Sequence, residues 1–109
     1  MNPHECINYC NKLLQRGQEI FLAVSLKARV LNFISGYEQA RQFIKPYLDQ
    51  NPNNDSLWVI FAEIHEYHDN RSAAISALQK AKQILEKENK QNNEENLNFL
   101  KIKLEQLIN

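Results

Sequence analysis

The sequence contains few of the residues that interrupt helices, with two glycines and three prolines among 109 residues. Because both residue types are unfavourable inside a helix, their scarcity favours an all-α chain. The sequence also lacks an apolar run near the roughly 18 residues that a membrane-spanning helix needs. Its first residues lack the charged start and apolar middle of a signal peptide. We therefore expect a cytoplasmic protein with no membrane insertion.

An excess of charge of either sign is also missing. Lysine plus arginine and aspartate plus glutamate number 13 each, which gives a formal net charge of zero. Proteins that bind nucleic acids or anionic membranes carry a basic field, so the balance argues against both kinds of partner. Hydrophobic residues make up 43% of the chain, which is enough for the core of one small domain.

Side chains with characteristic chemistry are scarce. Cys6 and Cys10 lie one helical turn apart on one face, where a disulfide has poor geometry, so we expect reduced, buried thiols. His65 and His68 lack the spacing of a zinc-protease helix. We find no phosphate-binding glycine loop, no nucleophile motif and no paired carboxylates in an acid–base setting. The sequence therefore predicts no enzymatic activity, no metal site and no cofactor.

The segment 51–88 carries two apolar stripes with helical spacing. The first stripe consists of Trp58, Phe61, Ala62 and His65, and the second consists of Ala74, Leu78 and Ala81. Between them, the polar end of the stretch 67–70 favours a turn. The pattern predicts two antiparallel helices, each with one apolar face, packed against each other.

This pattern resembles the tetratricopeptide repeat (TPR). The signature of that family runs Trp-x2-Leu-Gly-x2-Tyr, then Ala-x3-Phe, then Pro, with a period of about 34 residues. Trp58 and Ala74 match it outright, and His65 takes the place of the core Tyr, which implies a packing role. One period earlier, the same register falls on Val24, Ala28, Leu31, Ala40, Ile44 and Pro52. The chain is therefore similar to a small stand-alone TPR protein.

The resemblance implies one TPR-like domain over residues 1–109, with antiparallel helix pairs stacked as a short right-handed superhelix of about six helices. The expected parts are an N-terminal capping helix at 1–17, repeat 1 at 21–54, repeat 2 at 55–88 and a C-terminal capping helix at 94–108. The polar link before the last helix is longer than the repeat allows.

Several residues mark the expected helix ends. Asn2 is expected to cap the first helix and Gly17 to end it. The fourth helix is expected to start at Asp55 or Ser56, either of which can cap. Pro46 lies inside the third helix, where it removes a backbone hydrogen bond and should bend or break the last turn. We expect the two residues after it to be displaced from regular packing.

In TPR proteins the first helix of each pair lines a concave groove that binds peptides or helices. By register, the groove residues here are Leu26, Arg29, Asn32 and Phe33 in repeat 1, and Val59, Ile60, Glu63, Glu66 and Tyr67 in repeat 2. Their neighbours Leu22, Ser25 and Ser56 lie on the same faces, and Asn98, Ile102 and Glu105 are expected to join from the last helix. We expect Arg29 at one side of this groove, with Glu63 and Glu66 at the other facing a basic group of the partner.

Three functions remain open at this point. The first is a non-catalytic protein–protein interaction module, such as a small adaptor or a secretion-type chaperone, that binds a peptide or an amphipathic helix. The alternative is a self-associating scaffold piece, a homodimer held through Leu100, Ile102 and Leu107 of the last helix. The third is a nucleic-acid-associated regulator, which the balanced charge disfavours.

Overall fold

The computed structural model describes residues 2–88 and 93–108, and within these ranges the chain forms six α-helices and no strand. The helices are α1 (Pro3–Arg16), α2 (Ile20–Ile34), α3 (Tyr37–Gln50), α4 (Asp55–Tyr67), α5 (Arg71–Glu88) and α6 (Asn93–Ile108). The predicted all-α fold with about six helices is confirmed. The predicted polar link after α5 falls mostly on 89–92, which lie outside the described residues.

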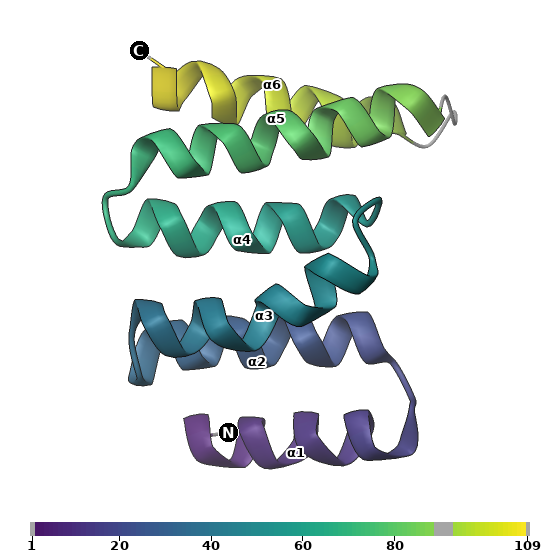
Figure 1. The fold of residues 1–109 in the computed structure, drawn as a ribbon, viewed down its shortest axis with the longest axis vertical. Helices are drawn as coiled ribbons and strands as arrows, with labels where there is room; N and C mark the ends of the chain where they lie inside the picture. Colours follow the sequence, from purple (N-terminus) through teal and green to yellow (C-terminus); the bar gives the residue numbers. More distant parts are fainter. Residues whose placement is uncertain (1, 89–92, 109) are drawn as a thin grey trace.

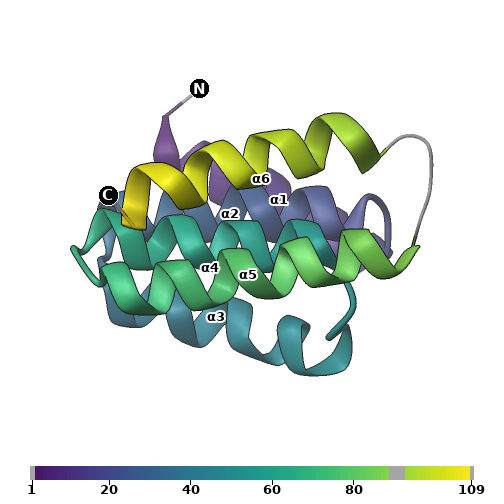
Figure 2. The ribbon, with the colours of Figure 1, turned by 90° about the horizontal axis from the view of Figure 1, so that it is seen from above.

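The helices form a stack in which α2 and α3 overlap at one level and α5 and α6 at another, and consecutive helices run antiparallel (Figure 1). As a result α2, α4 and α6 point in the same direction and begin at the same edge of the stack. Seen from above, α3 and α6 lie on opposite sides of the stack (Figure 2). Among the described residues, the backbone of α6 approaches that of α5 closely and that of no other helix, whereas α4 approaches α2, α3 and α5.

The helix ends follow the capping residues of the sequence, with one correction. Asn2 Oδ1 accepts a hydrogen bond of 2.8 Å from the Glu5 amide, and Gly17 ends α1 with φ of 67°, both as predicted. The cap of α4 is Asn54, whose Oδ1 accepts from the Leu57 amide at 3.2 Å. The predicted caps Asp55 and Ser56 are wrong because Asn54 has the extended backbone of a cap, and Asp55 is already helical.

Pro46 does not break α3, which continues to Gln50 and is bent in its second half (Figure 1). Leu48 is only 3% exposed and belongs to the core, so the predicted displacement of this residue is wrong. The physical reason is that Pro46 and Gln42 both lie on the exposed side of the helix. The carbonyl of Gln42, which loses its helical donor, therefore faces water.

Two hydrophobic clusters hold the stack together. The first lies between α2, α3 and α4 and contains Val24, Ala28, Ala40, Ile44, Leu48, Leu57, Ile60 and Ile64. The second lies between α4, α5 and α6 and contains Ala62, Ala74, Ala77, Leu78, Ala81, Leu85, Leu100, Leu104 and Leu107. Trp58 and Phe61 pack against both clusters, which makes α4 the central helix. None of the helices in the described ranges has the length and the hydropathy that a membrane span requires.

Candidate functional site

An open cleft with two neighbouring hollows lies between α4 and α6. The larger, of about 350 Å³, is lined by Leu22, Ser25, Arg29, Asp55, Ser56, Val59, Ile60, Leu85, Asn96, Phe99 and Leu100. The smaller, of about 280 Å³, is lined by Val59, Ala62, Glu63, Glu66, Leu78, Phe99 and Lys103. Val59 on α4 and Phe99 on α6 border both hollows. We call the two hollows together the α4–α6 cleft.

The cleft carries exposed apolar side chains. Phe99 on α6 is 56% exposed and Leu22 on α2 is 52% exposed, while Ile60 is 3% exposed and forms the floor. Monomeric proteins expose single apolar residues commonly, but apolar residues that gather in a concavity mark a binding surface. The cleft is therefore the candidate functional site.

The predicted groove residues divide between this cleft and other places. The cleft is lined by Arg29, Val59, Ile60, Glu63 and Glu66, as predicted. Their positions follow from helical periodicity, since residues three and four apart share one face of α2 or α4.

The other predicted groove residues do not line the cleft. Leu26 is half-buried on α2. Phe33 is 73% exposed and lies beside a separate hollow between α1 and α2, and Tyr67 is 62% exposed at the end of α4. Asn32 Oδ1 accepts a hydrogen bond of 2.7 Å from His68 Nε2, which ties α2 to the turn after α4.

Four charged residues of the cleft are paired with one another, contrary to the prediction. Arg29 Nε and Nη2 lie 3.0 and 3.2 Å from the two carboxylate oxygens of Glu63, 34 residues later in the chain. Lys103 Nζ lies 2.9 Å from Glu66 Oε1 across the cleft. The prediction of Arg29 on the opposite side, with both carboxylates facing a partner, is wrong. Because α2 and α4 lie side by side in one direction, Arg29 and Glu63 face each other directly.

The residues that α6 contributes also differ from the prediction. Asn96, Phe99 and Lys103 line the cleft in place of Asn98, Ile102 and Glu105. The longer link before α6 shifts its register away from the period of the earlier helices. The buried stripe of α6 is the sequence signal that identifies which of its residues line the cleft. Leu100, Leu104 and Leu107 face the core, and Asn96, Phe99 and Lys103 follow on the flank of this stripe that faces α4.

The same stripe corrects the surface predicted for self-association. Leu100 is 1% exposed and Leu107 is 8% exposed, because both pack in the core cluster shared with α5. Of the three residues named for a homodimer contact, only Ile102 is exposed, at 57%. An apolar stripe can be buried within its own chain or against a second chain, and the stripe of α6 is largely buried within the chain.

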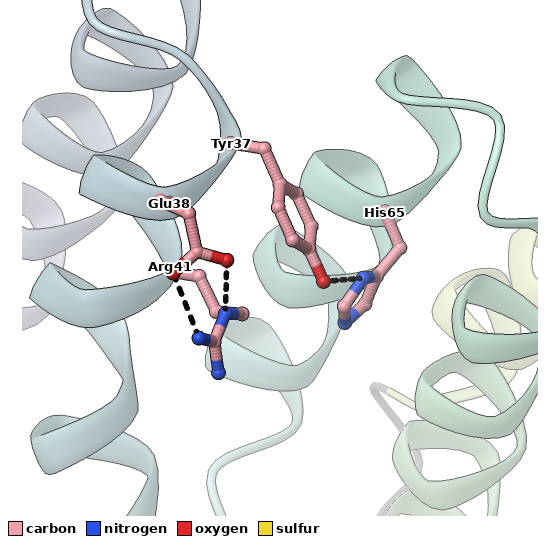
Figure 3. A network of polar contacts seen from close by, with 4 residues as sticks. All are labelled: Tyr37, Glu38, Arg41 and His65. Carbon is pink, nitrogen blue, oxygen red and sulfur yellow. Dashed lines mark hydrogen bonds and ion pairs between the residues drawn. The ribbon is translucent and has the colours of Figure 1, made fainter.

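His65 packs inside the stack. It is 5% exposed, its Nδ1 lies 3.1 Å from the Tyr37 hydroxyl, and the ring of Phe61 meets it edge-on at 4.4 Å between centroids. Figure 3 shows the contact of Tyr37 with His65 beside the ion pair of Glu38 with Arg41. Burial lowers the pKa of His65 below its ordinary value of 6.5, and the charges of Arg41 and His68 act in the same direction.

The chemistry outside the cleft is limited. Both cysteines are free thiols, and burial raises the pKa of Cys10, which is fully buried. A thiol with a raised pKa is a poor nucleophile and a poor metal ligand. Within 2–88 and 93–108, no three His, Cys, Asp or Glu side chains come together as a metal site would require.

Comparison with known proteins adds no further assignment. No family model matches the chain, and no curated protein or solved structure gave a match.

Proposed function

We propose that the chain is a non-catalytic protein–protein interaction module that holds a peptide or an amphipathic helix of a partner protein in the α4–α6 cleft. The observation that carries the proposal is the exposure of Phe99 at 56% and Leu22 at 52% on the walls of an open cleft. Binding of a partner that removes these side chains from water lowers the free energy of the complex. In this role the protein acts in the cytoplasm as a small adaptor or a secretion-type chaperone.

We further infer that the helices form a short stack of TPR-like repeats. In support, residues one period apart occupy equivalent buried places: Ala28 and Ala62 are 0% and 2% exposed, and Ala40 and Ala74 are both 0% exposed. Small side chains at such positions let neighbouring helices approach closely. The Arg29–Glu63 pair also joins residues 34 apart. In a stack of this kind the parallel helices α2, α4 and α6 form the binding face.

The polar groups of the cleft favour binding over catalysis. Arg29, Glu63, Glu66 and Lys103 are held in two ion pairs, so their charges are matched within the cleft. Among the described residues, every buried side-chain nitrogen or oxygen has a hydrogen-bond partner. A satisfied polar frame around exposed apolar side chains is typical of a docking surface.

A pull-down with matched variants tests the proposal. The tagged protein, the Phe99→Asp variant and the Tyr9→Asp variant are each incubated with native lysate, and bound chains are identified by mass. Phe99 and Tyr9 are 56% and 50% exposed, so both substitutions leave the core intact. Ile60 is unsuitable for this purpose because it is 3% exposed. Circular dichroism checks that both variants keep their helix content.

We expect one dominant partner that binds the unmodified protein and the Tyr9→Asp variant but not the Phe99→Asp variant. A charge at Phe99 would have to be buried in the complex without a counter-charge, which is costly. Retention of the partner by Phe99→Asp would contradict binding in the α4–α6 cleft. A protein that instead elutes as a stable dimer, converted to a monomer by Phe99→Asp, would show that a second copy occupies the cleft.

A further inference from the structure

A second apolar hollow adjoins the α4–α6 cleft. It lies between α1 and α2, has a volume of about 310 Å³ and is lined by Pro3, Cys6, Arg29, Val30 and Phe33. Among the described residues that line it, Arg29 alone is charged, and Phe33 is 73% exposed. We call it the α1–α2 hollow. Because Arg29 also lines the α4–α6 cleft, the two concavities meet at this residue.

The fold places both concavities on one side of the stack. The helices α1 and α6 lie at the two ends of the stack (Figure 1) and, seen from above, on the same side of it, opposite α3 (Figure 2). In the described part of the chain, the exposed large hydrophobic side chains belong to α1, α2, α4 and α6, and none belongs to α3 or α5. The helices α2 and α4 therefore form the floor of one groove, and α1 and α6 form its walls.

The ion pair of Arg29 with Glu63 lies between the two concavities. Its side chains are 52% and 42% exposed, so a segment that crosses the groove covers them. Glu63 binds Nε and Nη2 of the guanidinium, which has five N–H donors in all. A neutral polar group of the partner can accept from the other donors. A charged group would compete for one member of the pair and leave the other member without its counter-charge, which is costly once water is excluded.

We propose that a single segment of the partner protein fills both concavities, with one apolar side chain against Phe99 and a second against Phe33. A neutral polar residue between these two anchors lies over the Arg29–Glu63 pair. This inference rests on the proposed function, since it names the extent and the chemistry of the partner segment for the same groove. The apolar linings select the two anchors, and the matched charges select the neutral residue between them.

A displayed library of random 16-residue peptides provides the probe. Peptides are selected on the unmodified protein and counter-selected on the Phe99→Asp variant, and the best binders are synthesised and measured by fluorescence anisotropy. We expect two apolar residues with an asparagine, glutamine, serine or threonine between them. The affinity should change less than about twofold when the salt concentration rises from 50 mM to 500 mM, because the contact adds no new ion pair.

Two phenylalanine-to-alanine variants on α2 test the second anchor. Phe33→Ala should weaken the peptides about tenfold, because it removes the apolar contact in the α1–α2 hollow. Phe21→Ala is the matched control and should leave the affinity unchanged, since Phe21 is 42% exposed and lines neither concavity. Circular dichroism checks that both variants keep their helix content.

A double-mutant cycle assigns each anchor of the peptide to its concavity. Each of the two apolar residues is replaced by alanine in turn. One of these replacements should weaken binding to the unmodified protein and should have little further effect on the Phe33→Ala protein, because both changes remove the same contact.

The outcomes separate the inference from the function on which it rests. Equal affinity for the Phe33→Ala protein would refute the second anchor and leave the α4–α6 cleft as a binding site. Binders with a charged residue between their anchors, and with an affinity that falls steeply with salt, would refute the neutral centre. Failure to select any peptide that depends on Phe99 would refute both the inference and the proposed function. A dimer that dissociates in the Phe99→Asp variant would assign the groove to a second copy and would refute the partner segment.

Discussion

The docking of α6 can be tested by comparing two substitutions on the same helix. Leu100 is 1% exposed and lies in the cluster formed with α4 and α5, whereas Ile102 is 57% exposed. Leu100→Ala removes three carbons from this cluster. At about 0.8 kcal/mol per buried carbon, the lost transfer free energy is about 2.4 kcal/mol. A cavity term raises the cost to about 3 kcal/mol or more.

Ile102→Ala removes apolar carbons that remain largely in water, so its cost should stay below about 0.5 kcal/mol. Both free energies of unfolding are measured by urea denaturation followed by circular dichroism at 222 nm. A chain of this size is expected to be stable by about 5–15 kcal/mol, so the Leu100→Ala protein remains folded. Its melting temperature should fall by about 10 °C, while that of Ile102→Ala stays nearly unchanged.

The reasoning depends on which face of α6 meets the core. If Ile102→Ala cost as much as Leu100→Ala, then α6 would pack through its other face, and the α4–α6 cleft would not exist in this form. If Ile102→Ala alone destabilised the protein at high concentration but not at low concentration, Ile102 would be buried by self-association. Measurement at two protein concentrations distinguishes these results.

Three further predictions concern the rest of the stack. The pKa of His65 is lowered in the folded protein, so the unfolded chain takes up a proton first as the pH falls below 6.5. The free energy of unfolding should therefore decrease between pH 7.5 and 5.5, and it should decrease less in the His65→Gln variant. An equal dependence of this free energy on pH in the two proteins would contradict the prediction. Asn54→Ala should cost about 1 kcal/mol in urea denaturation, whereas Ser56→Ala should cost under about 0.5 kcal/mol if Asn54 is the cap. A double-mutant cycle on Arg29 and Glu63 should give a coupling of about 0.5 kcal/mol that vanishes in 1 M NaCl, and a coupling that persists would mean that the pair is shielded from solvent.

The sequence allowed the helices to be placed well because their signals are local. Asn2 and Gly17 mark the two ends of α1 through capping and a left-handed backbone. The alanines at 62 and 74 mark a close approach of α4 and α5, since only small side chains fit there. Signals of this kind depend on a few neighbouring residues, so one sequence is enough to find them.

The features that were missed depend on contacts between distant parts of the chain. The partner of Glu63 is Arg29, and nothing within one turn of either residue indicates the pair. The cap at Asn54 competes with two adjacent residues that can also cap, and backbone conformation decides among them. The register of α6 follows from how its leucines meet α5, which the period of the earlier helices does not determine.

The attachment of α6 has a mechanical consequence. Among the described helices, the backbone of α6 lies close to α5 alone. One ion pair, from Lys103 Nζ to Glu66 Oε1 at 2.9 Å, spans the opening between α6 and α4. A rotation of α6 about α5 would therefore change the width of the opening without breaking any helical hydrogen bond, at the cost of repacking Leu100, Leu104 and Leu107 in the core. The side chains of Lys103 and Glu66 are each about one-third exposed, so the strength of this ion pair depends on the salt concentration. Under the proposed function, such a movement would let the α4–α6 cleft accept partner segments of different width, while α4 stays packed against α2, α3 and α5.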